Sequence, residues 1–232
     1  RVIRQVAAES QKDEIMSRIK SFTSAEKASE TADLVIEAVP ENLALKQKIF
    51  SAIDKVAPAS CIFATNTSSL PIAEIGATIS RKDRFGGLHF FNPVTMMKLL
   101  EVVKGPETSQ ATFDAMMAYG KTIGKATVKC VDTPGFIVNR LLVPYLFEAI
   151  RLVERGDATK EDVDTGMKFG ASHPMGPFEL ADMVGLDTCK SILDGWSAKH
   201  PDVELFKPSP MLNKLVAEGK LGRKSGEGFY KY

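Results

Sequence analysis

The residues of this chain best suited to chemistry surround one histidine. His89 stands near the end of the apolar run 85–91, directly before an Asn-Pro turn, and Glu101 lies inside a second apolar run, 99–103. A histidine that a carboxylate holds in one orientation can accept a proton near neutral pH, which the removal of hydrogen from an alcohol requires. Since a buried carboxylate is costly unless it is paired, we expect Glu101 to be that partner.

Both residues also have ordinary interpretations. A histidine taken alone is more often packed or hydrogen-bonded in a core than catalytic. Glu101 could instead lie on the exposed face of an edge strand. Their shared apolar surroundings favour the catalytic interpretation.

An alternation of short apolar strands and helices must position this pair. Strands are predicted at 32–39, 61–66, 85–91, 99–103 and 126–131, and helices at 43–53, 70–79 and 110–123. This order predicts a parallel sheet covered on both faces, with ligands at the carboxyl ends of its strands. The same rim should carry a set of polar residues: Glu41, Asn66, Ser68, His89 and Asn92.

Local structure alone could explain several of these polar residues. The hydroxyls of 67–69 could cap a helix, and Glu41 could be a favourable charge at a helix start. Lys46, in the helix that follows, is more often a solvated surface lysine. A serine that caps nothing could hydrogen-bond a substrate oxygen beside His89.

The pattern changes after residue 131. The sequence Asp-Thr-Pro-Gly at 132–135 predicts a boundary, which gives domains 1–131 and 132–232, and the second domain is expected to be all helical. Residues 136–154 read as a helix that is apolar on nearly every side, with Pro144 as a predicted kink, so it should be buried or covered by another subunit. Asn139 on this helix is either a satisfied core amide or a ligand donor.

Composition excludes several classes of function. The formal net charge of the 232 residues is +1, which gives no electrostatic footprint for nucleic acid, and the apolar runs are too short to span a membrane. The three cysteines are far apart and have no partners at ligand spacing, so we expect free thiols and no metal site. Residues 1–30 predict a helix and a loop.

One expected motif is missing. A doubly wound dinucleotide-binding sheet normally begins with a strand and a GxGxxG turn, but no such turn precedes Asp33. We therefore expect the first strand-helix-strand unit, and with it the acidic ribose ligand, to lie upstream of Arg1 in an incomplete chain. The isolated chain is then not certain to bind a dinucleotide.

Several motifs together resemble one known family. Asn66-Thr-Ser-Ser69, Leu88-His-Phe-Phe-Asn-Pro93, Lys98-Leu-Leu-Glu101, Asp132-Thr-Pro-Gly-Phe-Ile-Val-Asn-Arg140, Pro174-Met-Gly-Pro-Phe-Glu-Leu180 and Gly226-Glu-Gly-Phe-Tyr230 occur in the order and spacing of the L-3-hydroxyacyl-CoA dehydrogenases. The resemblance implies an α/β fold: a partial Rossmann-like doubly wound sheet, lacking its first βαβ unit, followed by an all-α C-terminal domain. It also implies NAD-dependent oxidation of an L-3-hydroxyacyl-CoA to the 3-ketoacyl-CoA in fatty-acid β-oxidation.

The resemblance assigns roles residue by residue. His89 is implied as the general base and Glu101 as the residue that orients it, while Ser68 and Asn139 are implied to bind the reacting substrate oxygens. Six positions match family residues near the NAD cofactor: Glu41, Lys46, Asn66, Ser68, Asn92 and Lys224.

The family also implies a setting for the protein. We expect an acyl-CoA thioester substrate, a homodimer formed through the C-terminal helical domain, and a place in the mitochondrial matrix, or in the cytoplasm for a bacterial protein. Two alternatives stay open: a related dehydrogenase of a hydroxy acid or sugar acid without CoA, and a non-catalytic, crystallin-like protein on the same scaffold.

Overall fold

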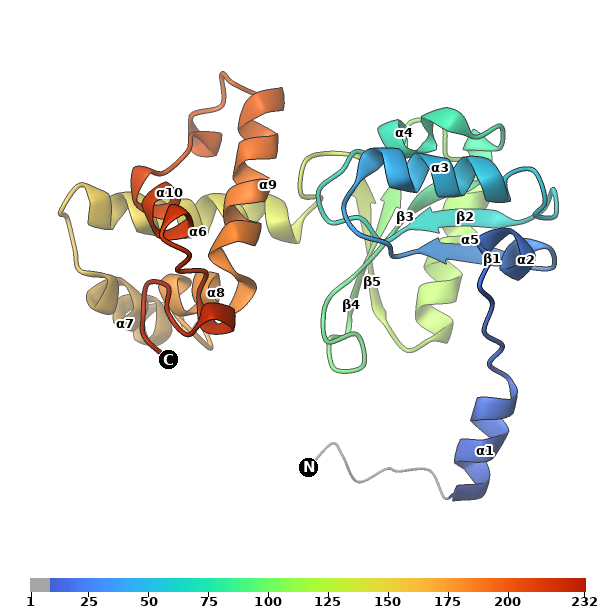
Figure 1. Cartoon of the computed structure of the whole chain (residues 1–232), viewed down its shortest axis with the longest axis horizontal. Helices are drawn as coiled ribbons and strands as arrows, with labels where there is room; N and C mark the ends of the chain where they lie inside the picture. Colours follow the sequence, from blue (N-terminus) through green and yellow to red (C-terminus); the bar gives the residue numbers. More distant parts are fainter. Residues whose placement is uncertain (1–8) are drawn as a thin grey trace. The chain divides into compact units, whose positions relative to one another are not determined.

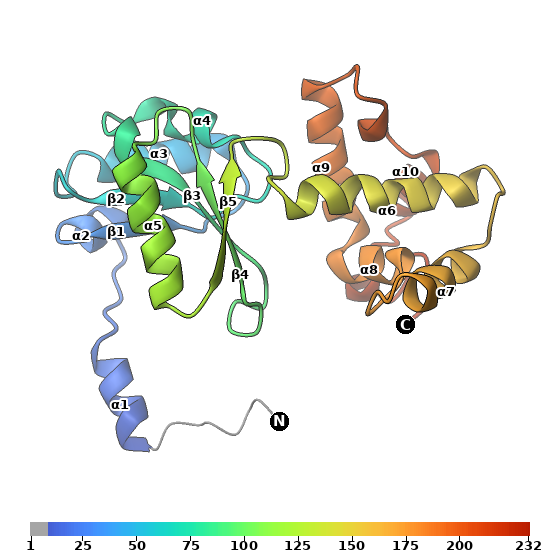
Figure 2. The same ribbon diagram turned by 180° about the vertical axis from the view of Figure 1, so that it is seen from behind.

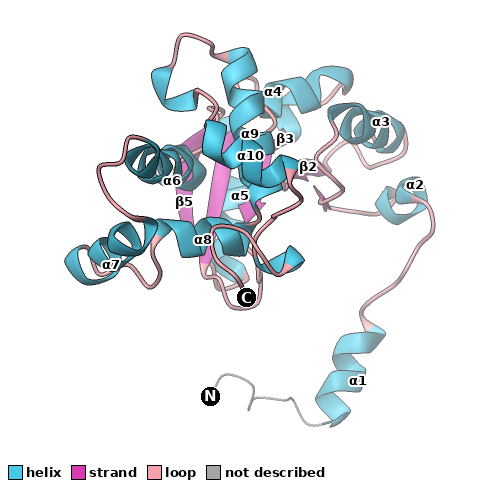
Figure 3. Cartoon of the chain, turned by 60° about the vertical axis from the view of Figure 1, so that its left-hand side comes forward, coloured by secondary structure: helices cyan, strands magenta, loops and turns pink. Residues whose placement is uncertain are grey.

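The computed structural model of the chain describes residues 9–232. It divides into two compact units, Arg1–Lys129 and Cys130–Tyr232, which we describe separately. The sequence placed this division after residue 131. The first unit, blue to green in Figure 1, holds the sheet, and the second, yellow to red, is built of helices and loops, as the colours of Figure 3 show.

A five-stranded sheet forms the centre of the first unit, in the order β1-β2-β3-β4-β5. Its strands are β1 (Leu34–Glu37), β2 (Ile62–Thr65), β3 (Phe85–Phe90), β4 (Leu99–Lys104) and β5 (Ala126–Val131). The first three are parallel, but β3 and β4 are antiparallel. The prediction of a fully parallel sheet was therefore wrong. Residues 91–98 join β3 to β4, and this segment is too short for the crossover of a dozen or more residues that a parallel pair needs.

Helices cover both faces of this sheet. Figure 1 shows α3 (Leu43–Ile53) and α4 (Ile72–Ile75) on one face, and Figure 2 shows α5 (Gln110–Thr122) on the other. On the first face, the buried ring of Phe50 packs edge-on against Phe85, with ring centroids 5.0 Å apart, and lies tilted against Phe63 at 5.8 Å. On the second, Phe113 and Met116 of α5 pack with apolar residues of the strands, including Leu88.

The ends of the helices follow from local chemistry. Asn42 caps α3, because its side-chain oxygen accepts a hydrogen bond from the amide of Leu45 at 3.0 Å. The helix predicted over 70–79 is shorter than expected: α4 ends at Ile75 and continues as a 3₁₀ turn, Gly76–Thr78. Before the sheet, the chain forms α1 (Glu9–Ser17) and α2 (Ala25–Ser29), so the helix expected within residues 1–30 is present and a second one follows it.

The second unit contains five α-helices among the described residues. They are α6 (Val138–Glu154), α7 (Lys160–Gly170), α8 (Pro177–Val184), α9 (Leu186–Lys199) and α10 (Pro210–Ala217). Short 3₁₀ turns lie at Glu204–Phe206 and Arg223–Ser225 of this unit, and another lies at Lys82–Arg84 of the first unit. The core of the unit gathers Phe147, Phe178, Leu193, Trp196 and Phe206.

Helix α6 departs from its expected burial. Val143, Leu146, Phe147 and Ile150 are buried along one side, whereas Leu141 is 70% exposed. The prediction of a helix apolar on nearly every side was wrong, because its charged residues collect on one side and make it amphipathic.

The chain end closes over α8. The buried carboxylate of Asp182 accepts hydrogen bonds from the amides of Phe229 and Tyr230, both at 2.9 Å, and from the hydroxyl of Tyr232 at 3.0 Å. Gly222 approaches this residue closely at a φ of +92°, which favours glycine. Two isolated antiparallel bridges, from Glu227 to Gly222 and from Glu227 to Lys231, also form in this segment.

Candidate active site

The antiparallel pairing of β3 and β4 brings the predicted base and carboxylate together. His89 lies directly opposite Glu101 in the register, and its Nδ1 is 2.7 Å from Glu101 Oε2. The two residues are 3% and 0% exposed. The edge-strand interpretation of Glu101 was wrong, because β4 lies between β3 and β5. A carboxylate only accepts hydrogen bonds, so Nδ1 of His89 is the donor in this pair, and in the neutral imidazole Nε2 is then the acceptor.

The second ring nitrogen of His89, Nε2, faces a serine in the loop after the neighbouring strand β2. Ser68 lies in the loop after β2, and its Oγ is 3.0 Å from His89 Nε2. With Nδ1 carrying the proton, the serine hydroxyl donates to Nε2. The site therefore contains a line of three groups, Glu101, His89 and Ser68, with a proton acceptor at its centre.

The loop that carries Ser68 is fastened by Glu41, which follows β1. Glu41 Oε1 accepts hydrogen bonds from the Ser68 amide at 2.6 Å, from the Thr67 hydroxyl at 2.8 Å and from the Ser69 amide at 3.2 Å. Thr67 Oγ1 in turn accepts a hydrogen bond from the amide of Leu70 at 3.0 Å. The hydroxyls of 67–69 thus organise a turn that receives a carboxylate, and the residue at the N-cap of α4 is Pro71.

Lys46 is not the solvated surface lysine that composition favours. Its side chain is 1% exposed, and Nζ lies 2.8 Å from Glu37 Oε1, 3.1 Å from the carbonyl oxygen of Val39 and 3.3 Å from Glu41 Oε2. Sequence reasoning did not select Glu37. The available signal was a carboxylate at the end of an otherwise apolar strand, since such a residue needs a buried partner.

The two asparagines at the strand ends differ in their surroundings. Asn66 is partly buried, and its Oδ1 accepts a hydrogen bond from the Phe90 amide at 2.8 Å, which ties the end of β2 to the end of β3. Asn92 follows β3 and is exposed. A cavity of about 400 Å³ opens at the ends of β1 and β2, lined by Ala38, Val39, Pro40, Glu41, Lys46, Asn66 and Ser68. Four of the six positions matched to the cofactor, Glu41, Lys46, Asn66 and Ser68, thus share one hollow.

The remaining two candidate residues belong to the second unit. Asn139 lies in the first turn of α6 and is partly buried. Lys224 Nζ binds Asp187 Oδ1 in a short ion pair of 2.5 Å, and this hydrogen bond holds the pKa of Asp187 below its usual range. The structure therefore brings together His89, Glu101, Ser68, Glu41, Lys46 and Asn66 within the first unit.

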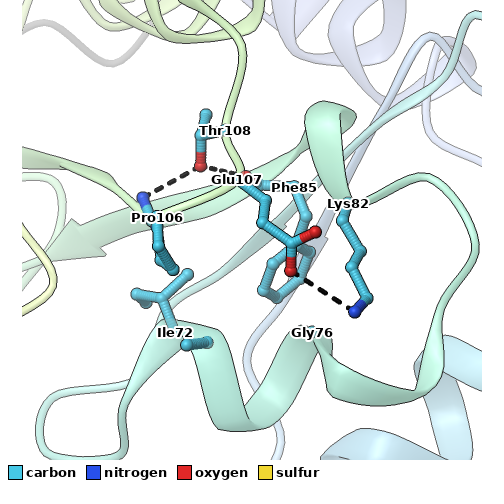
Figure 4. A pocket seen from close by; sticks show the side chains of 9 residues that line it. Ile72, Gly76, Lys82, Phe85, Pro106, Glu107 and Thr108 are labelled. Atoms are coloured by element: carbon cyan, nitrogen blue, oxygen red, sulfur yellow. Dashed lines mark hydrogen bonds and ion pairs between the residues drawn. The ribbon is translucent and has the colours of Figure 1, made fainter.

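A second cavity lies at the opposite ends of β3 and β4, and Figure 4 shows it from close by. Ile72, Gly76 and Phe85 give it an apolar floor, and an ion pair of 3.3 Å between Lys82 and Glu107 lies at its rim. Its volume of about 20 Å³ leaves room for little more than a water molecule. It holds none of the candidate site residues.

Two kinds of feature, a metal site and a membrane-spanning helix, are absent from the described residues 9–232. Within them, no group of three or more His, Cys, Asp or Glu side chains is arranged to hold a metal ion. None of the helices in this part of the chain combines the length and the apolar character that a membrane crossing demands.

Comparison with known proteins identifies the family. Residues 1–133 match the family model for the "3-hydroxyacyl-CoA dehydrogenase, NAD binding domain", and residues 135–232 match the model for the C-terminal domain of the same enzymes. A probable 3-hydroxyacyl-CoA dehydrogenase of Caenorhabditis elegans is 62% identical over 94% of this chain and 71% of the relative. The mitochondrial hydroxyacyl-coenzyme A dehydrogenase of Homo sapiens is 59% identical over 95% of this chain and 70% of its own length.

Solved structures agree with this similarity. The crystal structure of (S)-3-hydroxybutyryl-CoA dehydrogenase from Ralstonia eutropha superimposes with a TM-score of 0.92 at 42% identity, covering 97% of this chain and 79% of the other. The sheet followed by helices is thus the arrangement that the resemblance implied. The chain belongs to the 3-hydroxyacyl-CoA dehydrogenase family, whose members are NAD-dependent oxidoreductases.

Proposed function

We propose that this protein oxidises the 3-hydroxyl of an L-3-hydroxyacyl-CoA with His89 as the general base. The observation that carries the proposal is the position of His89 between Glu101, 2.7 Å from Nδ1, and Ser68, 3.0 Å from Nε2. A buried imidazole with one nitrogen committed to a carboxylate presents the other as a proton acceptor of fixed orientation. Family membership supports the reaction class.

The proton moves through this chain's own residues. The 3-hydroxyl of the substrate replaces the Ser68 hydroxyl as the hydrogen-bond donor to His89 Nε2. Nε2 then accepts the proton of this substrate hydroxyl as the carbon is oxidised. Glu101 stabilises the imidazolium that results, because a buried carboxylate next to a cation gains most in a medium of low dielectric. The Ser68 hydroxyl, no longer bonded to His89 Nε2, donates its hydrogen bond to the developing carbonyl oxygen of the substrate. NAD⁺, when bound, supplies the acceptor for the hydride.

The hollow at the ends of β1 and β2 fits part of such a cofactor. It lies at the carboxyl ends of parallel strands, where dinucleotides bind in folds of this class, and at 400 Å³ it suits one portion of a ligand of that size. Glu41, Lys46, Asn66 and Ser68 would face that portion. Asn92 and Lys224 are proposed to contact the cofactor as well, and Asn139 is proposed to bind a reacting substrate oxygen.

The test replaces the base. His89→Gln in the full-length protein keeps a polar side chain of similar size but removes the proton acceptor, and kcat is expected to fall by about 10²–10⁴-fold. His200→Gln is the matched control, since His200 is exposed at the end of α9. The rate of NADH formation from L-3-hydroxybutyryl-CoA measures both. Turnover of His89→Gln at the level of His200→Gln would reject the assignment.

The substrate class and the setting are part of the proposal. Acetoacetyl-CoA should give a far higher kcat/KM than free hydroxy acids or sugar acids, and the opposite ranking would favour a dehydrogenase that does not use CoA. We infer a homodimer formed through the second unit. The apolar side chain of Leu141 in α6 is 70% exposed in the single chain, and a partner subunit could cover it. We also infer a mitochondrial matrix location, supported by relatives named as mitochondrial.

A further inference from the structure

A group of three charged residues, two of them buried, reaches the candidate active site through the loop that carries Ser68. It consists of Glu37 at the end of β1, Lys46 in α3 and Glu41 in the loop between these elements. Glu37 and Lys46 are 4% and 1% exposed. Taking two charges out of water is costly unless both make close polar contacts. The contacts of this buried pair therefore show which neighbouring groups it holds in place.

Both carboxylate oxygens of Glu37 accept hydrogen bonds from neighbouring residues. Its Oε1 accepts hydrogen bonds from the Val39 amide at 2.6 Å and from Lys46 Nζ at 2.8 Å, and its Oε2 accepts one from the Thr65 hydroxyl at 2.7 Å. The carboxylate therefore cannot rotate without losing a partner. It fixes the ammonium of Lys46 at one point between β1 and α3.

The position of Lys46 sets the position of Glu41. An ammonium has three protons, and Lys46 Nζ has three acceptors within 3.3 Å, of which Glu41 Oε2 is the most distant. Two carboxylates share the one positive charge. Glu41 is therefore held on one side by Lys46 and on the other by the amides of Ser68 and Ser69.

We propose that Glu37 is a positioning residue for Ser68 and hence for the hydrogen bond to His89 Nε2. Without the charge of Glu37, Glu41 would be the only carboxylate paired with Lys46 and would move closer to it. This movement draws Glu41 away from the amides of Ser68 and Ser69 and from the hydroxyl of Thr67, so the Ser68 hydroxyl loses its fixed place. The inference rests on the proposed function, because its effect is read through turnover.

A double-mutant cycle tests the inference. In the full-length protein, Glu37→Gln keeps the shape of the side chain and removes its charge, and we expect kcat to fall about tenfold. In a Ser68→Ala background the same substitution should lower kcat by less than about twofold, because the group through which it acts is already absent. If Glu37→Gln does not fold, Thr65→Val removes the hydrogen bond to Glu37 Oε2, together with the longer one of 3.3 Å that Thr65 Oγ1 accepts from the Thr67 amide, and it should show the same non-additivity with a smaller effect.

Asp54→Asn provides the matched control. Asp54 is a carboxylate in the same unit, paired with Arg81 at 2.6 Å at the end of α3, and it makes no contact with the Glu41 network. Its effect on kcat, whatever its size, should be the same with and without Ser68. Equal effects of Glu37→Gln in both backgrounds would overturn the inference and leave the proposed function standing. A wild-type protein without hydroxyacyl-CoA turnover would instead refute the proposed function.

Discussion

Replacement of Glu101 by glutamine separates the chemical role of this residue from its structural role. Glu101 is wholly buried, and its carboxylate accepts the hydrogen bond from His89 Nδ1 at 2.7 Å. Glutamine preserves the volume and one acceptor oxygen but not the charge. The loss should therefore appear mainly in the step that makes His89 positive.

The magnitude follows from the change in hydrogen bond. A hydrogen bond to a charged acceptor contributes about 1.5–3 kcal/mol and a neutral one about 0.5–1.5 kcal/mol, so the transition state loses about 1–2 kcal/mol. This corresponds to a fall in kcat of about 5–30-fold. If the glutamine amide rotates and donates to Nδ1, the imidazole keeps its proton on Nε2 and the loss rises toward about 10⁴-fold.

The stability of the variant should change less than its turnover. Glutamine keeps the volume of this buried side chain and one acceptor oxygen, so no cavity forms and the melting temperature should fall by only a few degrees. Steady-state oxidation of L-3-hydroxybutyryl-CoA, followed by NADH absorbance, gives kcat, and thermal unfolding gives Tm. Glu107→Gln, just beyond the other end of β4 and 62% exposed, is the control. A kcat for Glu101→Gln within twofold of this control, or a large fall in Tm, would refute the reasoning.

Two other expectations concern stability. Burial opposes ionisation of Asp54, but hydrogen bonds from the Ser80 amide and hydroxyl and from Arg81 outweigh it and lower the pKa of Asp54 below its usual value. Its contribution is therefore present above the unfolded pKa of about 3.9 and is lost as pH falls through the lower native pKa, so Asp54→Asn should cost about 1–2 kcal/mol in urea unfolding at neutral pH and less below about pH 4. An equal cost at both pH values would contradict this. Gly222→Ala places a Cβ 2.3 Å from the carbonyl oxygen of Asp182 at a φ of +92°, and it should lower Tm by several degrees; an unchanged Tm would show that the chain end is not held there.

The pairing of His89 with Glu101 was predictable because both are polar residues inside apolar runs. Burial of such residues is costly, and the cheapest solution is for them to meet. The direction of β4 was predictable in principle as well. Residues 91–98 leave no room for the crossover that a parallel pair needs. The alternation of strands and helices elsewhere in the first unit favoured a parallel sheet, but the length of this one connection decides the direction of β4.

The network around Lys46 was harder to foresee. A lysine in a helix of otherwise amphipathic pattern reads as a surface residue, and nothing local indicates that β1 presents Glu37 to it. The ion pair depends on how α3 returns over the sheet, which is a tertiary property. The burial of α6 was misjudged for a related reason, since counting apolar residues along 136–154 hid the side on which its charges lie.

The hairpin of β3 and β4 has a consequence for how this catalytic apparatus can diversify. His89 and Glu101 are twelve positions apart and are opposed by antiparallel pairing within one continuous segment, so their alignment needs no long-range assembly. Such a segment forms a self-contained module whose geometry survives remodelling of distant loops. Changes elsewhere in the chain that leave residues 85–104 intact can then accumulate while the pairing of His89 with Glu101 is inherited unchanged.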